Sequence, residues 1–219
     1  MKRLIMSMTV AVLGLALGSL AAGPQLGGRP AEEWIVRLER PERVAGLKVD
    51  EIISKLGLKP GLVVADVGAG PGVFSWPLAR AVAPGKVYAV EVDQRFIDHL
   101  KRRTTEQQLT NVHPVLGKFE DPMIPEKVDL AFFHDVLHHV DKREAYVQKV
   151  ASYVKPSGRI AVIELDATRP DASHRDEKDL QVTREELDTW MKAAGLRKLE
   201  EIPLSEEKWF VIYGKTAEK

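Results

Sequence analysis

"VVADVGAGPGVFS", residues Val63 to Ser75, joins a valine-rich apolar run to a turn that carries Gly68, Gly70 and Gly72 at alternate positions. The apolar run is short enough for a buried strand of a parallel sheet. Glycine is used where the backbone takes unusual dihedral angles or where another group approaches it closely. The stretch therefore predicts a strand followed by a turn that receives a ligand.

Predicted helices and strands alternate along the rest of the chain. After the strand at 62–67, further strands are predicted at 87–92, 112–117, 127–136, 159–165, 197–204 and 208–215, with helices at 73–83, 94–109, 142–153 and 183–196. This alternation over short connections is typical of a parallel sheet covered on both faces. No helix separates the last two strands, so we expect them to pair antiparallel. The predicted fold class is α/β: a doubly wound, mostly parallel, seven-stranded sheet with an antiparallel C-terminal edge strand.

Composition limits the classes of function. The chain of 219 residues carries 32 basic and 32 acidic side chains, which gives a formal net charge of zero. A net charge of zero gives no indication of a broad positive surface for nucleic acid, so we expect no nucleic-acid partner. The sequence contains no cysteine, which excludes disulfides, thiolate metal sites and cysteine nucleophiles.

The N-terminal segment departs from this composition. Lys2 and Arg3 precede an uncharged, mostly apolar stretch from Leu4 to Ala22. A basic start, an apolar stretch and small residues at its end are typical of a secretory signal. We therefore expect an exported protein, periplasmic or secreted; the alternative is an uncleaved membrane anchor over residues 4–22. The expected organisation is a signal or anchor at 1–22, a flexible spacer at 23–30, an N-terminal helical segment or lid at 31–60, and the α/β domain at 61–219.

Two classes of cofactor use a glycine turn after the first strand of such a sheet. The dinucleotide fingerprint G-x-G-x-x-G, started at Gly68, requires a third glycine where Val73 stands, so an NAD-dependent oxidoreductase is disfavoured. Glu91 follows Gly70 by 21 residues, close to the spacing of a carboxylate that binds a ribose. Asp93 either competes with Glu91 for this role or caps the helix that follows.

The pattern D-x-G-x-G-x-G, from Asp66 to Gly72, resembles the first motif of class I S-adenosylmethionine-dependent methyltransferases. "GKFEDPMIP" resembles their adenine-contacting segment, "VDLAFFHDVLHHV" their fourth strand and active-site loop, and "VKPSGRIAVIE" the turn into their fifth strand. The resemblance covers roughly residues 44–215 and implies a Rossmann-like methyltransferase fold with S-adenosylmethionine as cofactor. It assigns cofactor contacts to Asp66, Gly68, Ala69, Gly70, Gly72, Glu91, Val92, Glu120, Asp121, His134 and Asp135.

One position departs from the family pattern. The acid that contacts adenine usually follows the glycine of the third segment directly, but Lys118 stands there. Glu120 or Asp121 must therefore take over this contact, or the backbone at Phe119 makes it.

Methyl transfer to a hydroxyl or an acidic carbon is helped by a base. The cluster "HDVLHH" supplies His138 as the candidate base, and on a helix Asp135 would lie three or four residues before His138 or His139 and could orient an imidazole. Alternatively, His139 packs inside and Asp135 caps the helix. No metal ligands are predicted.

Upstream, "ERPER" lies where related folds place a lid, and there Arg43 either meets a carboxylate or is an ordinary surface arginine.

The implied function is methyl transfer from S-adenosylmethionine to a small-molecule acceptor. The alternative is a non-catalytic binding protein on the same fold, because the cofactor is made in the cytosol whereas the chain is expected to be exported.

Overall fold

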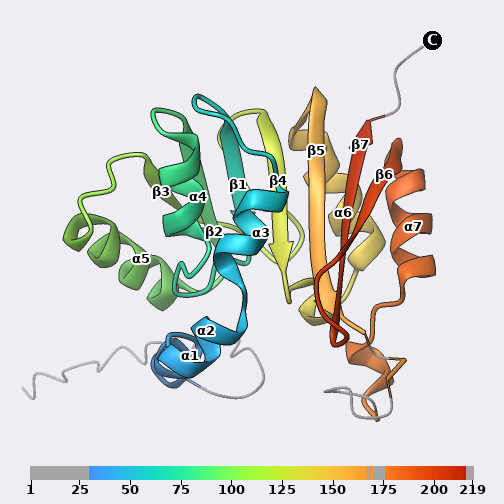
Figure 1. Ribbon diagram of the computed structural model, residues 1–219, viewed down its shortest axis with the longest axis horizontal. Helices are drawn as coiled ribbons and strands as arrows, with labels where there is room; N and C mark the ends of the chain where they lie inside the picture. Colours follow the sequence, from blue (N-terminus) through green and yellow to red (C-terminus); the bar gives the residue numbers. More distant parts are fainter. Residues whose placement is uncertain (1–29, 167, 170–175, 216–219) are drawn as a thin grey trace, which may run out of the picture.

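The computed structural model describes residues 30–166, 168–169 and 176–215 (Figure 1). The predicted signal or anchor at 1–22 and nearly all of the predicted spacer at 23–30 lie outside these ranges. Among the residues that are described, no helix has both the length and the apolar character needed to cross a membrane.

A seven-stranded sheet lies at the centre of the fold, with the strand order β3-β2-β1-β4-β5-β7-β6. The strands are β1 (Val63–Val67), β2 (Lys86–Glu91), β3 (Val112–Leu116), β4 (Val128–His134), β5 (Val154–Leu165), β6 (Leu196–Pro203) and β7 (Lys208–Lys215). The first five are parallel, and β7 runs antiparallel to both β5 and β6. The predicted mostly parallel α/β sheet with antiparallel C-terminal pairing is confirmed; β7 inserts between β5 and β6, which leaves β6 at the edge.

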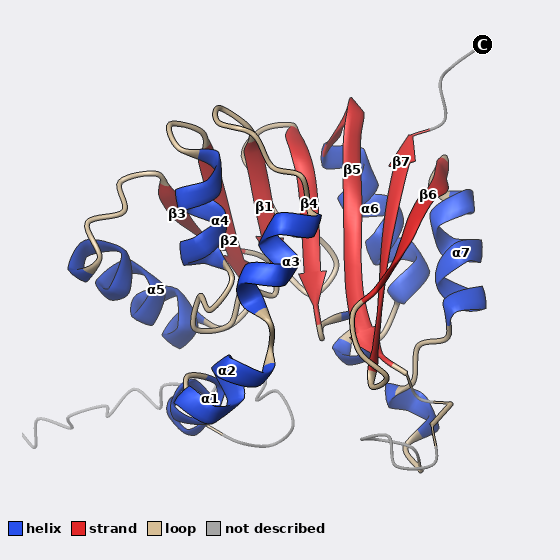
Figure 2. Ribbon diagram, in the orientation of Figure 1, coloured by secondary structure: helices blue, strands red, loops and turns tan. Residues whose placement is uncertain are grey.

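Helices cover both faces of the sheet (Figure 2). One face carries α3 (Val49–Lys55), α4 (Ser75–Val82) and α5 (Gln94–Glu106), and the other carries α6 (Arg143–Tyr153) and α7 (Arg184–Ala193). Successive strand residues point to opposite faces, so Val64 packs with the first group and Ala65 with the second. Two apolar cores, one on each face, therefore hold the strand ends at fixed positions.

Local sequence signals account for the starts of two helices, α5 and α7. The Thr183 hydroxyl accepts from the backbone N–H of Glu186 and the Glu186 carboxylate accepts from that of Thr183, which is the predicted capping box at the start of α7. Asp93 caps α5 by accepting from the backbone N–H of Arg95. One expectation is wrong: β5 already begins at Val154, which pairs with Val128 of β4. Residues 155–158 therefore belong to β5 rather than to a turn before it, and they form an irregular stretch before the pairing resumes at Arg159 with Leu130.

Two further helices, α1 (Ala31–Leu38) and α2 (Pro41–Gly46), lie at the end of the sheet toward which the parallel strands run (Figure 1). Glu39, between them, contacts α5 through His99 Nε2 at 3.2 Å and Arg103 Nε at 3.7 Å. These contacts dock the N-terminal helices beside the carboxyl edge of the sheet.

Candidate functional site

The strand order reverses between β1 and β4, because the chain adds β2 and β3 on one side of β1 and then returns to place β4 on the other. In open α/β sheets, ligands bind beyond the carboxyl ends of the strands at this reversal. The glycine turn follows β1 directly, and the HDVLHH cluster follows β4. The topology therefore brings the two predicted halves of the site to one place.

All three glycines of the turn have left-handed backbone angles, with φ of 73° at Gly68, 55° at Gly70 and 94° at Gly72. A Cβ on Gly68 would lie 2.5 Å from a side-chain carbon of Val136, and one on Gly72 would lie 2.3 Å from the ring of Trp76. At Gly70 the nearest such atom is Leu38 Cδ1, at 3.6 Å. Gly68 and Gly72 are thus required by the packing of the turn itself, whereas Gly70 leaves space beside it.

This difference predicts unequal effects on stability. Gly72→Ala should lower the free energy of unfolding by about 2–4 kcal/mol, because a left-handed backbone and an overpacked contact with Trp76 add together. Gly70→Ala, which carries only the backbone penalty, should lower it by about 1–2 kcal/mol. Urea denaturation of both variants measures the difference; equal losses would contradict the role given to Trp76.

Glu91, at the end of β2, is buried and bonded to the turn. Its Oε1 accepts from the backbone N–H of Gly70 at 2.7 Å, and its Oε2 accepts from that of Val92 at 3.0 Å. Burial raises the pKa of the Glu91 carboxyl, and the two backbone hydrogen bonds oppose the rise. The structure therefore joins Gly70, Glu91 and Val92 in one network, while Asp93 is used as a helix cap.

Asp66 lies beneath the same turn. Its carboxyl group is buried and accepts a hydrogen bond from Ser75 Oγ at 2.5 Å. Burial raises the pKa of Asp66 to about 7, the Ser75 hydrogen bond lowers it, and the charge of Glu91 raises it further. The backbone N–H groups of Gly68 and Ala69 both donate to the carbonyl of Val90, at 2.9 and 3.0 Å, so this part of the turn is fixed to β2.

The segment after β3 contains the two acidic candidates for the adenine contact, Glu120 and Asp121, and they lie in different surroundings. Asp121 accepts from the hydroxyl of Tyr153 at 2.8 Å and forms an ion pair with Lys149 Nζ at 3.0 Å, so it is engaged with α6. Glu120 lies exposed on the surface. Phe119 is 47% exposed in the same loop, which also offers an apolar surface. Which of these residues contacts adenine stays a prediction.

The end of β4 holds His134 and Asp135. The buried ring of His134 lies 4.5 Å, centroid to centroid, from the ring of Phe74, and burial lowers the pKa of His134 to about 4. Asp135 has a left-handed backbone, with φ of 57°, and its Oδ2 forms an ion pair with Lys208 Nζ. Its Oδ1 is buried and has no hydrogen-bond partner within the described ranges.

His138 is held by a residue that the sequence did not indicate. Glu164, at the end of β5, accepts the backbone N–H of His138 at 3.0 Å and lies 3.0 Å from the imidazole Nδ1. Both side chains are buried. The expectation that Asp135 orients His138 or His139 is wrong, because residues Leu137–His139 form a single 3-10 turn (η2) and Asp135 turns toward Lys208 instead.

His139 is exposed, with its ring 4.0 Å from that of His138, so the alternative that it packs inside is also wrong. A signal for Glu164 did exist in the sequence, because it is an acidic residue within the apolar run "IAVIEL".

In the described ranges, no group of three or more His, Asp or Glu side chains is arranged to hold a metal ion.

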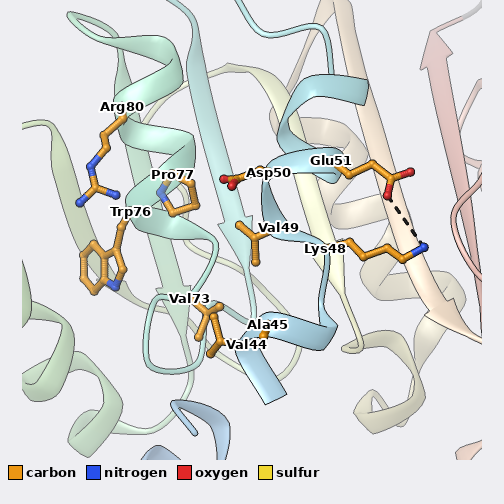
Figure 3. Close-up of a pocket in the computed structure, with 10 residues that line it drawn as sticks. All are labelled: Val44, Ala45, Lys48, Val49, Asp50, Glu51, Val73, Trp76, Pro77 and Arg80. Carbon is orange, nitrogen blue, oxygen red and sulfur yellow. Dashed lines mark ion pairs between the residues drawn. The ribbon is translucent and has the colours of Figure 1, made fainter. Parts of the chain in front are cut away.

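A groove of about 620 Å³ lies between α2, α3 and α4 (Figure 3). Most of its wall is apolar, and an ion pair between Lys48 and Glu51, with N and O 3.9 Å apart, lies at its rim. None of the predicted site residues lines it, although Val73 adjoins the glycine turn. The groove is therefore a neighbour of the site and not part of it.

Comparison with known proteins gives a consistent result. A family model described as a methyltransferase domain matches residues 58–201. The magnesium-protoporphyrin O-methyltransferase of Synechocystis is 30% identical over 100 residues, which cover 44% of this chain and 43% of that protein. The curated relatives are matched over only 22–43% of their own length.

Solved structures share the fold. A SAM-dependent methyltransferase from Aquifex aeolicus superposes with a TM-score of 0.75 at 22% identity, covering 84% of this chain and 98% of that chain. The O-methyltransferase NcsB1 of neocarzinostatin biosynthesis, solved with S-adenosyl-L-homocysteine and 1,4-dihydroxy-2-naphthoic acid, gives a TM-score of 0.67 at 22% identity. That match covers 85% of this chain and 57% of NcsB1.

Proposed function

The chain belongs to the methyltransferase domain family of class I, S-adenosylmethionine-dependent enzymes, and on that premise we propose that it methylates a small-molecule acceptor. The observation that carries the proposal is a juxtaposition at the strand reversal. A glycine turn bonded to the buried carboxylate of Glu91 packs, through Gly68 and Val136, against the segment that carries the buried His138–Glu164 pair. The glycine turn with Glu91 is suited to bind the cofactor, and the His138–Glu164 pair is suited to take a proton from the molecule that receives the methyl group.

The residues of the turn fit the cofactor. The Glu91 carboxylate, whose oxygens each have a second lone pair, would accept hydrogen bonds from the ribose hydroxyls. Gly70 leaves room beside the backbone, and the orphaned Oδ1 of Asp135 suits a donor at the methionyl end. When bound, the cofactor supplies an electrophilic methyl group on a good leaving group.

His138 would act as the general base. An ionised Glu164 can only accept hydrogen bonds, so it holds the proton on His138 Nδ1 and leaves the lone pair on Nε2. Nε2 would then take the proton of an acceptor hydroxyl as the oxygen attacks the methyl carbon. Glu164 is a positioning residue in this scheme, since it also stabilises the imidazolium that forms.

A small-molecule acceptor is supported by the zero net charge and by one curated relative, the magnesium-protoporphyrin O-methyltransferase, whereas two other curated relatives are named as tRNA-modifying enzymes. We also propose that the apolar segment 4–22 directs export or anchors the chain to a membrane, and that nucleic acid is not a partner. Export would separate the protein from cytosolic cofactor, which is the argument for the non-catalytic alternative.

The test is a calorimetric titration of the purified protein with S-adenosylmethionine, S-adenosylhomocysteine and NADH, followed by an assay of labelled methyl transfer to a panel of hydroxylated small molecules. We expect both sulfur compounds to bind and NADH not to bind. Binding of neither sulfur compound would overturn the proposal. Binding of both without transfer to any acceptor in the panel would favour the non-catalytic alternative.

A further inference from the structure

Two charged side chains from distant parts of the chain flank the glycine turn with unused bonding capacity: Arg43 of α2 and Asp135 after β4. We propose that they form a clamp for an α-amino acid group, in which Arg43 pairs with the carboxylate and Asp135 Oδ1 accepts from the ammonium of the methionyl end of the cofactor. The inference rests on the proposed function and extends it to a residue of the N-terminal helices.

The guanidinium of Arg43 has no counter-ion among the residues that the structure describes. It is half-buried and donates one hydrogen bond, from Nη1 to the carbonyl of Leu38 at 3.2 Å. It forms no ion pair with any other residue in the described part of the chain. Burial lowers the pKa of Arg43 and the charge of Asp135 raises it, so the two groups interact electrostatically. An anionic ligand would stabilise this partly desolvated cation, and a planar guanidinium can form two parallel hydrogen bonds to a carboxylate.

One carboxylate oxygen of Asp135 has no donor among the described residues. Lys208 occupies Oδ2, whereas Oδ1 is buried and unbonded. The residue also keeps a left-handed backbone, a conformation that persists in non-glycine residues only where the surroundings impose it and that is common at ligand sites. A buried acceptor of this kind is satisfied by an N–H or ammonium donor.

Contacts with the turn place both groups along it. Leu38, which accepts the hydrogen bond of Arg43, lies over Gly70, and Val136, which follows Asp135, lies against Gly68. With the ribose assigned to Glu91 and Gly70, the amino acid end of the cofactor would extend from Gly70 toward β4. It would thus meet one cation and one free acceptor, which match the two charges of a zwitterion.

The clamp is tested with three ligands that share the adenosine and the S-methyl group. S-adenosylmethionine carries the carboxylate and the ammonium, decarboxylated S-adenosylmethionine lacks the carboxylate, and 5′-methylthioadenosine lacks the whole amino acid group and, with it, the positive charge on sulfur. Calorimetric titration of the full chain should show that Arg43→Met weakens S-adenosylmethionine binding at least tenfold and changes the other two by less than twofold. Asp135→Ala should weaken the first two ligands and spare 5′-methylthioadenosine.

Arg40→Met is the matched control, since Arg40 is an exposed arginine that precedes the same helix, and it should change none of the affinities. Circular dichroism melting identifies a variant that fails to fold, in which case the uncharged Arg43→Gln replaces Arg43→Met. Unchanged affinity of folded Arg43 variants, or an equal loss for all three ligands, would overturn the clamp. Failure of the wild-type protein to bind S-adenosylmethionine would instead overturn the proposed function and the clamp with it.

Discussion

Replacing Glu91 by alanine is expected to lower the affinity for S-adenosylmethionine about 100-fold, or about 2.7 kcal/mol. The carboxylate would accept hydrogen bonds from the ribose, and bonds to a charged group contribute about 1.5–3 kcal/mol each. The same change leaves the backbone N–H of Gly70 without its acceptor, 2.7 Å away in the structure, and so loosens the turn. Calorimetric titration with S-adenosylmethionine measures the loss.

Two further variants separate binding from folding. Glu91→Gln keeps an acceptor for Gly70 but lacks the charge, so its loss should be smaller. Asp93→Ala removes a neighbouring carboxylate that caps α5; it should cost about 1 kcal/mol of stability and leave the affinity unchanged. An affinity that falls with Asp93→Ala and survives Glu91→Ala would contradict the assignment of the ribose to Glu91.

The framework of the site could be predicted because it depends on local patterns and on one rule of topology. The apolar run before Gly68 specifies a buried strand, and the carboxyl ends of parallel strands lie at one edge of the sheet. Glu91 could be found by spacing, since one helix and one strand separate it from the glycine turn. Its bond to Gly70 follows from the pairing of β1 with β2.

Partners from strands that are distant in sequence could not be predicted in this way. Glu164 follows His138 by 26 residues and Lys208 follows Asp135 by 73, and both contacts depend on the lateral order β4-β5-β7. Two consecutive strands at the end of a chain can be added to a sheet in either order, so the insertion of β7 beside β5 is not encoded in the periodicity. The expected pairing of Asp135 with His138 assumed α-helical spacing, which the left-handed Asp135 and the short 3-10 turn do not provide.

Loss of the His138 side chain is the second large effect that we expect. A positioned general base typically contributes 10²–10⁴ in rate, so His138→Ala should lower kcat by roughly that factor for a hydroxyl acceptor identified in the panel. The affinity for S-adenosylmethionine should be unchanged, because no cofactor contact is assigned to His138. Labelled methyl transfer gives kcat and KM, and calorimetry gives the cofactor Kd.

Glu164→Gln distinguishes positioning from packing. The amide keeps the size of the side chain but cannot stabilise an imidazolium by charge, so kcat should fall by roughly 10–100-fold, less than in His138→Ala, with KM and the cofactor Kd unchanged. His139→Ala, which removes an exposed imidazole next to His138, is the matched control and should retain activity. Added imidazole should restore part of the activity of His138→Ala, since the space left by the ring admits it. Full activity in both His138→Ala and Glu164→Gln would exclude base catalysis by this pair.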